Sequence, residues 1–215
     1  MAMLKIPGHE HQRAGEVTLD EILAVLGDCR LCPLCETRKN IVFGVGNPHA
    51  RVVLVGEAPG ANEDAQGEPF VGQAGHLLDR MLTEQTGIAR EEVYIANVLK
   101  CRPPGNRDPR PEEIEVCSPF LREQIRSIWP DVIMTMGNPA TRFILRTEVG
   151  ITRLRGKVFH EGHFAVLPTF HPAAVLRDSS KLPTLEADFA LLGKLLRGEI
   201  AFDDATAGAI PERVR

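Results

Sequence analysis

The sequence lacks a long apolar run and lacks a signal-like start. Its apolar stretches are far shorter than the roughly 20 residues that a membrane-spanning helix needs. The first residues do not show the basic and then apolar pattern of a secretory signal. These absences argue against a membrane protein and a secreted protein, so we expect a soluble, cytoplasmic protein with no membrane partner.

The chain also lacks a strong excess of either charge. With 25 Lys and Arg against 29 Asp and Glu, its formal net charge is −4, which argues against a surface that is basic throughout. Two local basic clusters remain. The first surrounds Asp108 and contains Lys100, Arg102, Arg107 and Arg110. The second surrounds Glu148 and contains Arg142, Arg146, Arg153, Arg155 and Lys157. Each cluster could hold phosphate or be an ordinary solvated face.

Length and composition favour one domain. A chain of 215 residues, 43% of them hydrophobic, can bury one sizeable core but has little room for two. We place the domain at residues 16–198. The segments 1–15 and 199–215 have no apolar periodicity, and we expect both to be loosely ordered.

The five cysteines are grouped in a way that favours a metal cage over disulfides. They are Cys29, Cys32, Cys35, Cys101 and Cys117. A C-x2-C pair followed by two cysteines with fifteen residues between them is typical of thiolate ligation in a cytosolic protein, where thiols stay reduced. Four thiolates could hold either zinc or an iron–sulfur cluster, and spacing alone does not separate the two.

Apolar patterns predict an α/β domain. Strands are expected at 51–56, 93–96 and 131–136, helices at 18–27, 74–86, 111–128, 138–146 and 185–196, and a hairpin at 156–160 and 163–168. The alternation of strands and helices indicates a central, mostly parallel sheet flanked by helices.

Polar and aromatic side chains follow the expected strands. Glu57 comes directly after the first strand, with Phe70 further along the same loop; Asn97 follows the second strand and His171 the last. Ligands of open parallel sheets bind beyond the carboxyl ends of the strands, so these groups should converge. A carboxylate, a ring, an amide and an imidazole together suit a planar, polar heterocycle.

Four long motifs now give the chain a family resemblance. They are CRLCPLC, GEAPGANEDAQGEPFVGQAG, IANVLKCRPPGNRDP and TFHPAAVLR. Together they resemble the family 4 uracil-DNA glycosylases, the iron–sulfur branch of that superfamily, over about residues 25–197. The resemblance implies an α/β/α sandwich and a monofunctional enzyme that removes flipped-out uracil from DNA, leaving an abasic site for base excision repair.

The resemblance assigns a [4Fe-4S] cluster to four of the five cysteines. Cys29, Cys32, Cys101 and Cys117 match the family's ligands. Cys35 is left over, and we interpret it as a small buried side chain. The cluster would be structural, ordering the arginine-rich loop between Cys101 and Cys117 near DNA phosphates.

The resemblance also implies how uracil is bound. Asn97 would read the O4 and N3–H edge, which cytosine inverts, and Phe70 would stack on the base. Backbone groups of Gly56, Glu57 and Ala58 would contact the uracil, since glycine allows close approach.

Catalysis would then depend on one imidazole and one carboxylate. A donor from His171 would stabilise the charge that develops on uracil O2. Relatives with a GQDPY loop have an aspartate where this chain has Ala58, so Glu57 and Glu63 are the candidates for positioning water. We expect Glu57 to hydrogen-bond to Asn106 and Glu63 to hold the water.

DNA would be gripped and distorted by residues outside the uracil site. Arg102, Arg107 and Arg155 would contact phosphates. Leu176 and Arg177, together with Val175, would form a wedge in the base stack, although core packing of a short helix is the alternative. A monomer is expected.

Two alternatives remain open. One is a cluster-bearing, non-catalytic DNA-binding module that has kept the fold. The other is a relative that bonds covalently to the abasic product. That relative carries a basic, histidine-bearing insertion, whereas residues 97–111 of this chain contain no histidine and no insertion.

Overall fold

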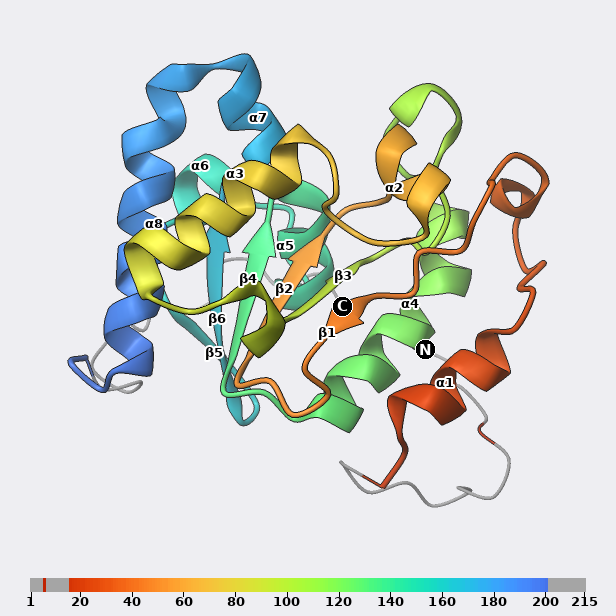
Figure 1. The fold of residues 1–215 in the computed structure, drawn as a ribbon, viewed down its shortest axis with the longest axis horizontal. Coiled ribbons are helices and arrows are strands. Elements are labelled where there is room, and N and C mark those ends of the chain that lie inside the picture. Colours follow the sequence, from red (N-terminus) through yellow and green to blue (C-terminus); the bar gives the residue numbers. More distant parts are fainter. Residues whose placement is uncertain (1–5, 7–15, 201–215) are drawn as a thin grey trace.

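The computed structural model describes residue 6 and residues 16–200, which fold around one six-stranded sheet (Figure 1). The strand order is β1-β3-β2-β4-β6-β5, with the middle four strands parallel and the two edge strands antiparallel to their neighbours. The strands are β1 (Val45–Gly46), β2 (Val52–Gly56), β3 (Tyr94–Asn97), β4 (Val132–Met136), β5 (Phe159–Glu161) and β6 (Phe164–Thr169). The predicted mostly parallel α/β sheet is therefore confirmed.

Helices cover both faces of the sheet. They are α1 (Leu19–Leu26), α2 (Ala61–Gln66), α3 (Gln73–Met81), α4 (Pro111–Ile128), α5 (Asn138–Leu145), α6 (Ile151–Leu154), α7 (Pro172–Arg177) and α8 (Leu182–Leu196). Helices α3, α7 and α8 pack on one face, and α4, α5 and α6 pack on the other (Figure 1). The result is a three-layer α/β/α arrangement, with α1 resting on α4.

The sheet forms where the sequence is continuously apolar. Every residue of β2, β3 and β4 is buried, as expected for parallel strands covered on both faces. Helix α1 begins after Thr18, whose side chain makes a reciprocal capping box with Glu21, and it ends at Gly27. Both ends agree with the prediction.

Several local elements differ from the prediction. The helix expected over 74–86 ends at Met81, and residues 82–86 form a π turn that stops at Gly87 with φ 75°. The hairpin turn consists of Gly162 and His163, one residue later than expected. Helices α2 and α6 were not predicted, because α2 has no apolar face and α6 is only four residues long.

The four parallel strands end together at one edge of the sheet. Gly56 pairs with Asn97 across β2 and β3, and Met136 pairs with Thr169 across β4 and β6. The segments that follow these strands therefore share one edge, as expected for a ligand site of an open parallel sheet.

The predictions about the two chain ends and about membrane-spanning segments can be compared with the structure only in part. The segments expected to be loosely ordered fall almost wholly on residues 1–5, 7–15 and 201–215, which lie outside the described residues. Within residue 6 and residues 16–200, no helix is both long and apolar enough to cross a membrane.

Candidate active site and cysteine cage

Gly56 and Asn97 form the floor of the site at the strand ends. Their register brings the two backbones together, and a Cβ on Gly56 would lie 2.3 Å from Asn97 Oδ1 and 2.8 Å from the Phe70 ring. Phe70 therefore lies directly over these strand ends. We call Gly56, Glu57, Phe70, Asn97 and His171 the strand-end site.

The Asn97 side chain carries an unused acceptor. The residue is 2% exposed, and its Oδ1 is the one buried side-chain N or O atom in the described part of the chain without a hydrogen-bond partner. A buried acceptor left unpaired costs about 1–3 kcal/mol. The strand-end site therefore holds an acceptor that is positioned for a donor from outside the protein.

Phe70 is held in a strained but well-supported conformation. Its φ is 55°, in the left-handed region that side chains rarely adopt, and its ring stacks on His171 with centroids 5.4 Å apart. A Cβ on Gly75 would lie 1.8 Å from the Phe70 carbonyl oxygen, so only glycine allows α3 to approach this closely. Gly75 was not among the residues predicted from the sequence.

His171 is fixed in one tautomer. It caps α7, and its Nδ1 accepts a hydrogen bond from the Ala173 backbone N–H at 3.1 Å. Burial lowers the pKa of His171 to about 4, with a further lowering by Arg177. The imidazole is therefore neutral at physiological pH, and its proton sits on Nε2, which is free to donate.

Glu57 carries a carboxylate that no side chain or backbone group of the described residues satisfies. Burial and the negative charge of Asp108 together raise the pKa of Glu57 to about 6, against an opposing effect of Arg177. The expected hydrogen bond to Asn106 is absent from the described residues. Asn106 Oδ1 instead accepts from Arg102 Nε at 2.7 Å.

Glu63 braces the loop that carries Phe70. Its Oε1 accepts from the backbone N–H groups of Val71 and Gly72, both at 3.0 Å, and its Oε2 accepts from Gly60 at 3.1 Å. Three backbone donors satisfy most of this carboxylate. These hydrogen bonds hold the Phe70 loop in place. They do not support the water-binding role expected for Glu63.

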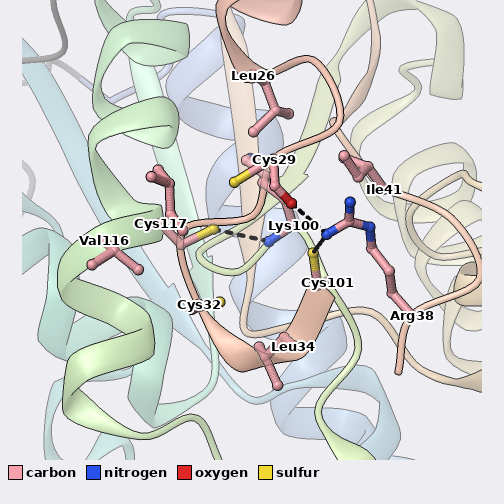
Figure 2. A pocket seen from close by; sticks show the side chains of 11 residues that line it. Leu26, Cys29, Cys32, Leu34, Arg38, Ile41, Lys100, Cys101, Val116 and Cys117 are labelled. Atoms are coloured by element: carbon pink, nitrogen blue, oxygen red, sulfur yellow. Dashed lines mark hydrogen bonds between the residues drawn. The ribbon is translucent and has the colours of Figure 1, made fainter. Parts of the chain in front are cut away.

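Four cysteines line one recess (Figure 2). Cys29 and Cys32 follow α1, Cys101 follows β3 and Cys117 lies on α4, so the recess joins three distant segments. The other lining side chains are Leu26, Leu31, Leu34, Arg38, Ile41, Lys100 and Val116. We call these four cysteines the cysteine cage.

The donor set of the cage fits a thiolate-bound cluster. All five cysteines are free thiols, and burial raises the pKa of Cys101 to about 11, so metal binding would have to release protons. No group of three or more His, Cys, Asp or Glu side chains in residue 6 and residues 16–200 is placed to hold a metal ion. Four cysteine thiols around one recess are a donor set that iron–sulfur clusters and structural zinc both use.

Two cations lie beside the cage. Arg38 Nη1 donates to the Cys29 carbonyl at 2.7 Å and lies 3.5 Å from Cys101 Sγ, and the Lys100 backbone N–H points at Cys117 Sγ at 3.3 Å (Figure 2). Neither contact was predicted from the sequence. Cys35 does not line the recess, and it is half-buried where a buried side chain was expected.

Two of the arginines expected on phosphates are engaged inside the protein. Arg155 Nε donates to Asp188 Oδ2 at 2.9 Å, and its Nη2 contacts the other oxygen of this fully buried carboxylate. Arg107 makes two bonds, at 2.9 and 2.5 Å, to Glu113, whose side chain is 2% exposed. Because buried carboxylates bind both guanidinium groups, neither arginine is readily available to contact a DNA phosphate.

The expected wedge on α7 is only partly exposed. Leu176 is 52% exposed, and Arg177 beside it is also exposed. Val175 is 3% exposed and packs in the core between the sheet and α3, so it cannot belong to a wedge.

Comparison with known proteins identifies relatives. The model of the uracil DNA glycosylase superfamily matches residues 43–194, which contain the whole strand-end site, Cys101 and Cys117. The type-4 uracil-DNA glycosylase of Archaeoglobus fulgidus is 46% identical over 83% of this chain and 93% of its own length. That of Thermotoga maritima is 47% identical over 76% of this chain and 88% of its own length. The type-5 uracil-DNA glycosylase of Pyrobaculum aerophilum is 29% identical, over 64% of this chain and 67% of its own length.

Proposed function

The chain belongs to the uracil DNA glycosylase superfamily and, within it, to the type-4 uracil-DNA glycosylases, and we propose that it hydrolyses the N-glycosidic bond of uracil in DNA. The product would be an abasic site, the starting point of base excision repair. Family membership supports the reaction, and the geometry of the strand-end site supports the following assignment of roles.

Uracil selection rests on the unpartnered Oδ1 of Asn97, the observation that carries the proposal. This acceptor would receive uracil N3–H, and the amide nitrogen would donate to O4. Cytosine has an acceptor at N3 and a donor at position 4, so each contact would be inverted. Opposed or unpaired groups in a buried site cost about 1–3 kcal/mol each, enough for strong discrimination.

Phe70 and the neighbouring backbone would hold the flipped base. The aromatic ring supplies a stacking face, and Gly56 and its neighbours Glu57 and Ala58 supply backbone groups at close range. The strain at Phe70 supports this role, because Gly75 and Glu63 keep its loop in a conformation that the residue alone would disfavour.

His171 would stabilise the leaving group. Breaking the bond from sugar to base places negative charge on uracil O2, and a neutral imidazole with its proton on Nε2 can donate to that oxygen without transferring the proton. The tautomer imposed by Ala173 and the lowered pKa both support this role.

Glu57 is the better candidate for activating water. Its carboxylate is free of hydrogen bonds in the described residues, and its pKa of about 6 lets it be ionised at neutral pH yet still able to accept a proton. Glu63 is occupied by three backbone donors. We therefore assign the water to Glu57 and the support of the Phe70 loop to Glu63.

Cys29, Cys32, Cys101 and Cys117 would hold a [4Fe-4S] cluster. When bound, the cluster would act as a structural crosslink between the segment after α1, the segment after β3 and helix α4. The loop between Cys101 and Cys117, which carries Arg102 and Arg110, would thereby be fixed at the carboxyl edge of the sheet.

DNA phosphates would be contacted by arginines that no buried carboxylate holds. Arg110, Arg153 and Arg177 are exposed, and their guanidinium groups have no hydrogen-bond or ion-pair partner among the described residues. They lie on segments that follow the parallel strands, and Arg102, whose Nε donates to Asn106, lies on the same loop as Arg110. We assign the phosphate contacts to these four in place of Arg107 and Arg155, with Leu176 as the wedge. All these residues come from one chain, so we expect a monomer.

Single-turnover cleavage tests the proposal. A labelled oligonucleotide with one uracil is compared with its cytosine and thymine counterparts, and alkali then breaks any abasic site. Cleavage of the uracil strand alone is the expected result. No cleavage by protein that contains iron would favour the binding-module alternative, and a DNA adduct that survives a denaturing gel would favour covalent trapping.

A further inference from the structure

Lys100 is a buried cation with no acidic partner. The residue is 1% exposed, and its Nζ donates to the Asn97 carbonyl oxygen at 3.0 Å and to Gln124 Oε1 at 2.6 Å. Both partners are neutral. Its backbone N–H points at Cys117 Sγ, and its carbonyl accepts from Val42 N–H at 2.8 Å. Lys100 thus contacts Cys117 of the cysteine cage, as Figure 2 shows, and also the backbone of the residue assigned to uracil recognition.

Gln124 fixes the far side of this contact. It is 0% exposed, and its Nε2 donates to the Phe43 carbonyl and to the Tyr94 hydroxyl, both at 3.0 Å. An ammonium group can only donate, so the amide oxygen must face Lys100 and the amide nitrogen must face the other two partners. Each polar atom of the Gln124 side chain is used, which gives the network one arrangement.

Asn97 needs such support because its side chain has no internal partner at Oδ1. Its side-chain position follows from its backbone, which is held on one side by the ladder to Gly56 and on the other by the Lys100 ammonium. A charged donor makes a stronger hydrogen bond than a neutral one. The end of β3 therefore keeps its position where regular strand pairing stops.

We infer that Lys100 is a positioning residue that ties the Asn97 backbone to helix α4 and to the cysteine cage, so that the Asn97 amide meets uracil at a fixed place. The inference rests on the proposed function. Lys100 does not touch the substrate, and its effect is on the binding of the base rather than on the grip of the DNA backbone.

The test uses Lys100→Met, which keeps an unbranched side chain of similar size but removes the donor. The full-length, iron-containing protein is assayed for inhibition by free uracil, for the single-turnover rate at saturating DNA and for affinity toward DNA with a stable abasic analogue. Loss of a charged hydrogen bond predicts about tenfold weaker inhibition by uracil and about a tenfold lower rate. Affinity for the abasic analogue should stay within about twofold.

Tyr94→Phe is the matched control. It removes a buried hydrogen bond from the same network and the same strand but leaves Lys100 on Asn97. It should lower stability without changing inhibition by uracil. A purely structural role for the network would make both variants behave alike.

A second variant keeps the inference open to refutation if Lys100→Met does not fold or loses iron. Gln124→Met leaves the Lys100 backbone and the cage intact but frees the ammonium from α4, so inhibition by uracil should weaken about threefold at full iron content. Unchanged inhibition in the folded variants would overturn the inference. If the wild-type protein cleaves uracil DNA, the proposed function holds, and unchanged inhibition in the variants then counts only against the role of Lys100.

Discussion

Replacing Gly56 by alanine is the most direct test of the strand-end site. Gly56 ends β2 opposite Asn97, and a Cβ there would lie 2.3 Å from Asn97 Oδ1 and 2.8 Å from Phe70 Cε2 and Cζ. Real Cβ atoms essentially never approach other heavy atoms below 3.0 Å. One methyl group therefore forces both side chains assigned to uracil to move.

Neither side chain can move freely. The Phe70 backbone is pressed against Gly75, and the Asn97 carbonyl is held by Lys100. Overpacking of a well-packed core costs about 1–3 kcal/mol, and we expect a loss of stability in that range. A displacement of about 1 Å in groups that position a substrate can reduce the rate about 100-fold, which is the expected loss for uracil excision.

The assay combines single-turnover cleavage of a uracil oligonucleotide with unfolding in urea. Gly150→Ala is the matched control, because Gly150 has an ordinary φ of −73° and no neighbouring heavy atom lies within 4 Å of the place that a Cβ would take. The control should behave like wild type. A Gly56→Ala protein that excises uracil within about threefold of the wild-type rate would refute the assignment of Asn97 and Phe70 to the base.

The charges and thiols of the protein give three further tests. Below pH 6 the rate should fall about tenfold per unit, because the pKa of Glu57 is about 6 and only its ionised form accepts a proton; Glu57→Gln should lack this acid limb in a pH–rate profile. Arg155→Ala should lower the free energy of unfolding in urea by about 3–5 kcal/mol, because Asp188 would stay buried with the Thr169 hydroxyl but without a counter-charge. Arg153→Ala should leave stability unchanged and reduce the salt dependence of DNA binding by about one ion. Cys35→Ser should retain iron and visible absorption while Cys101→Ser loses both, and equal loss in the two would contradict the assigned cage.

Strands β2, β3 and β4 could be predicted because they are buried on both faces and therefore read as short apolar runs, whereas the two-residue edge strand β1 is exposed in part and was not predicted. The long helix α4 could be predicted for a similar reason, since its buried positions repeat with a helical period. Helix α2 could not be predicted in this way. Its one buried residue is Asp64, which accepts from the Lys39 backbone N–H, so it is held by polar contacts with a distant loop.

The residues of the site were predicted together from motifs, but their partners were not. The stacking of Phe70 on His171 joins residues about a hundred positions apart, and the pairing of Arg155 with Asp188 joins residues 33 positions apart. An isolated arginine in a basic segment is typical of a phosphate contact. Only the fold reveals whether a buried carboxylate already holds it, and for Arg155 one does.

The cage and the strand-end site share one short stretch of backbone, through which a bound cluster would influence chemistry that it does not touch. The Val98 and Leu99 N–H groups donate at 3.0 Å to the carbonyls of Gly56 and Glu57, continuing the β2–β3 ladder beyond the regular strands. Lys100 and Cys101 follow at once, so the segment that places Asn97 and Glu57 is the segment that the cage anchors. A cluster bound there would crosslink the backbone that carries the residues we assign to base recognition and water activation, while the reacting atoms stayed distant from the metal.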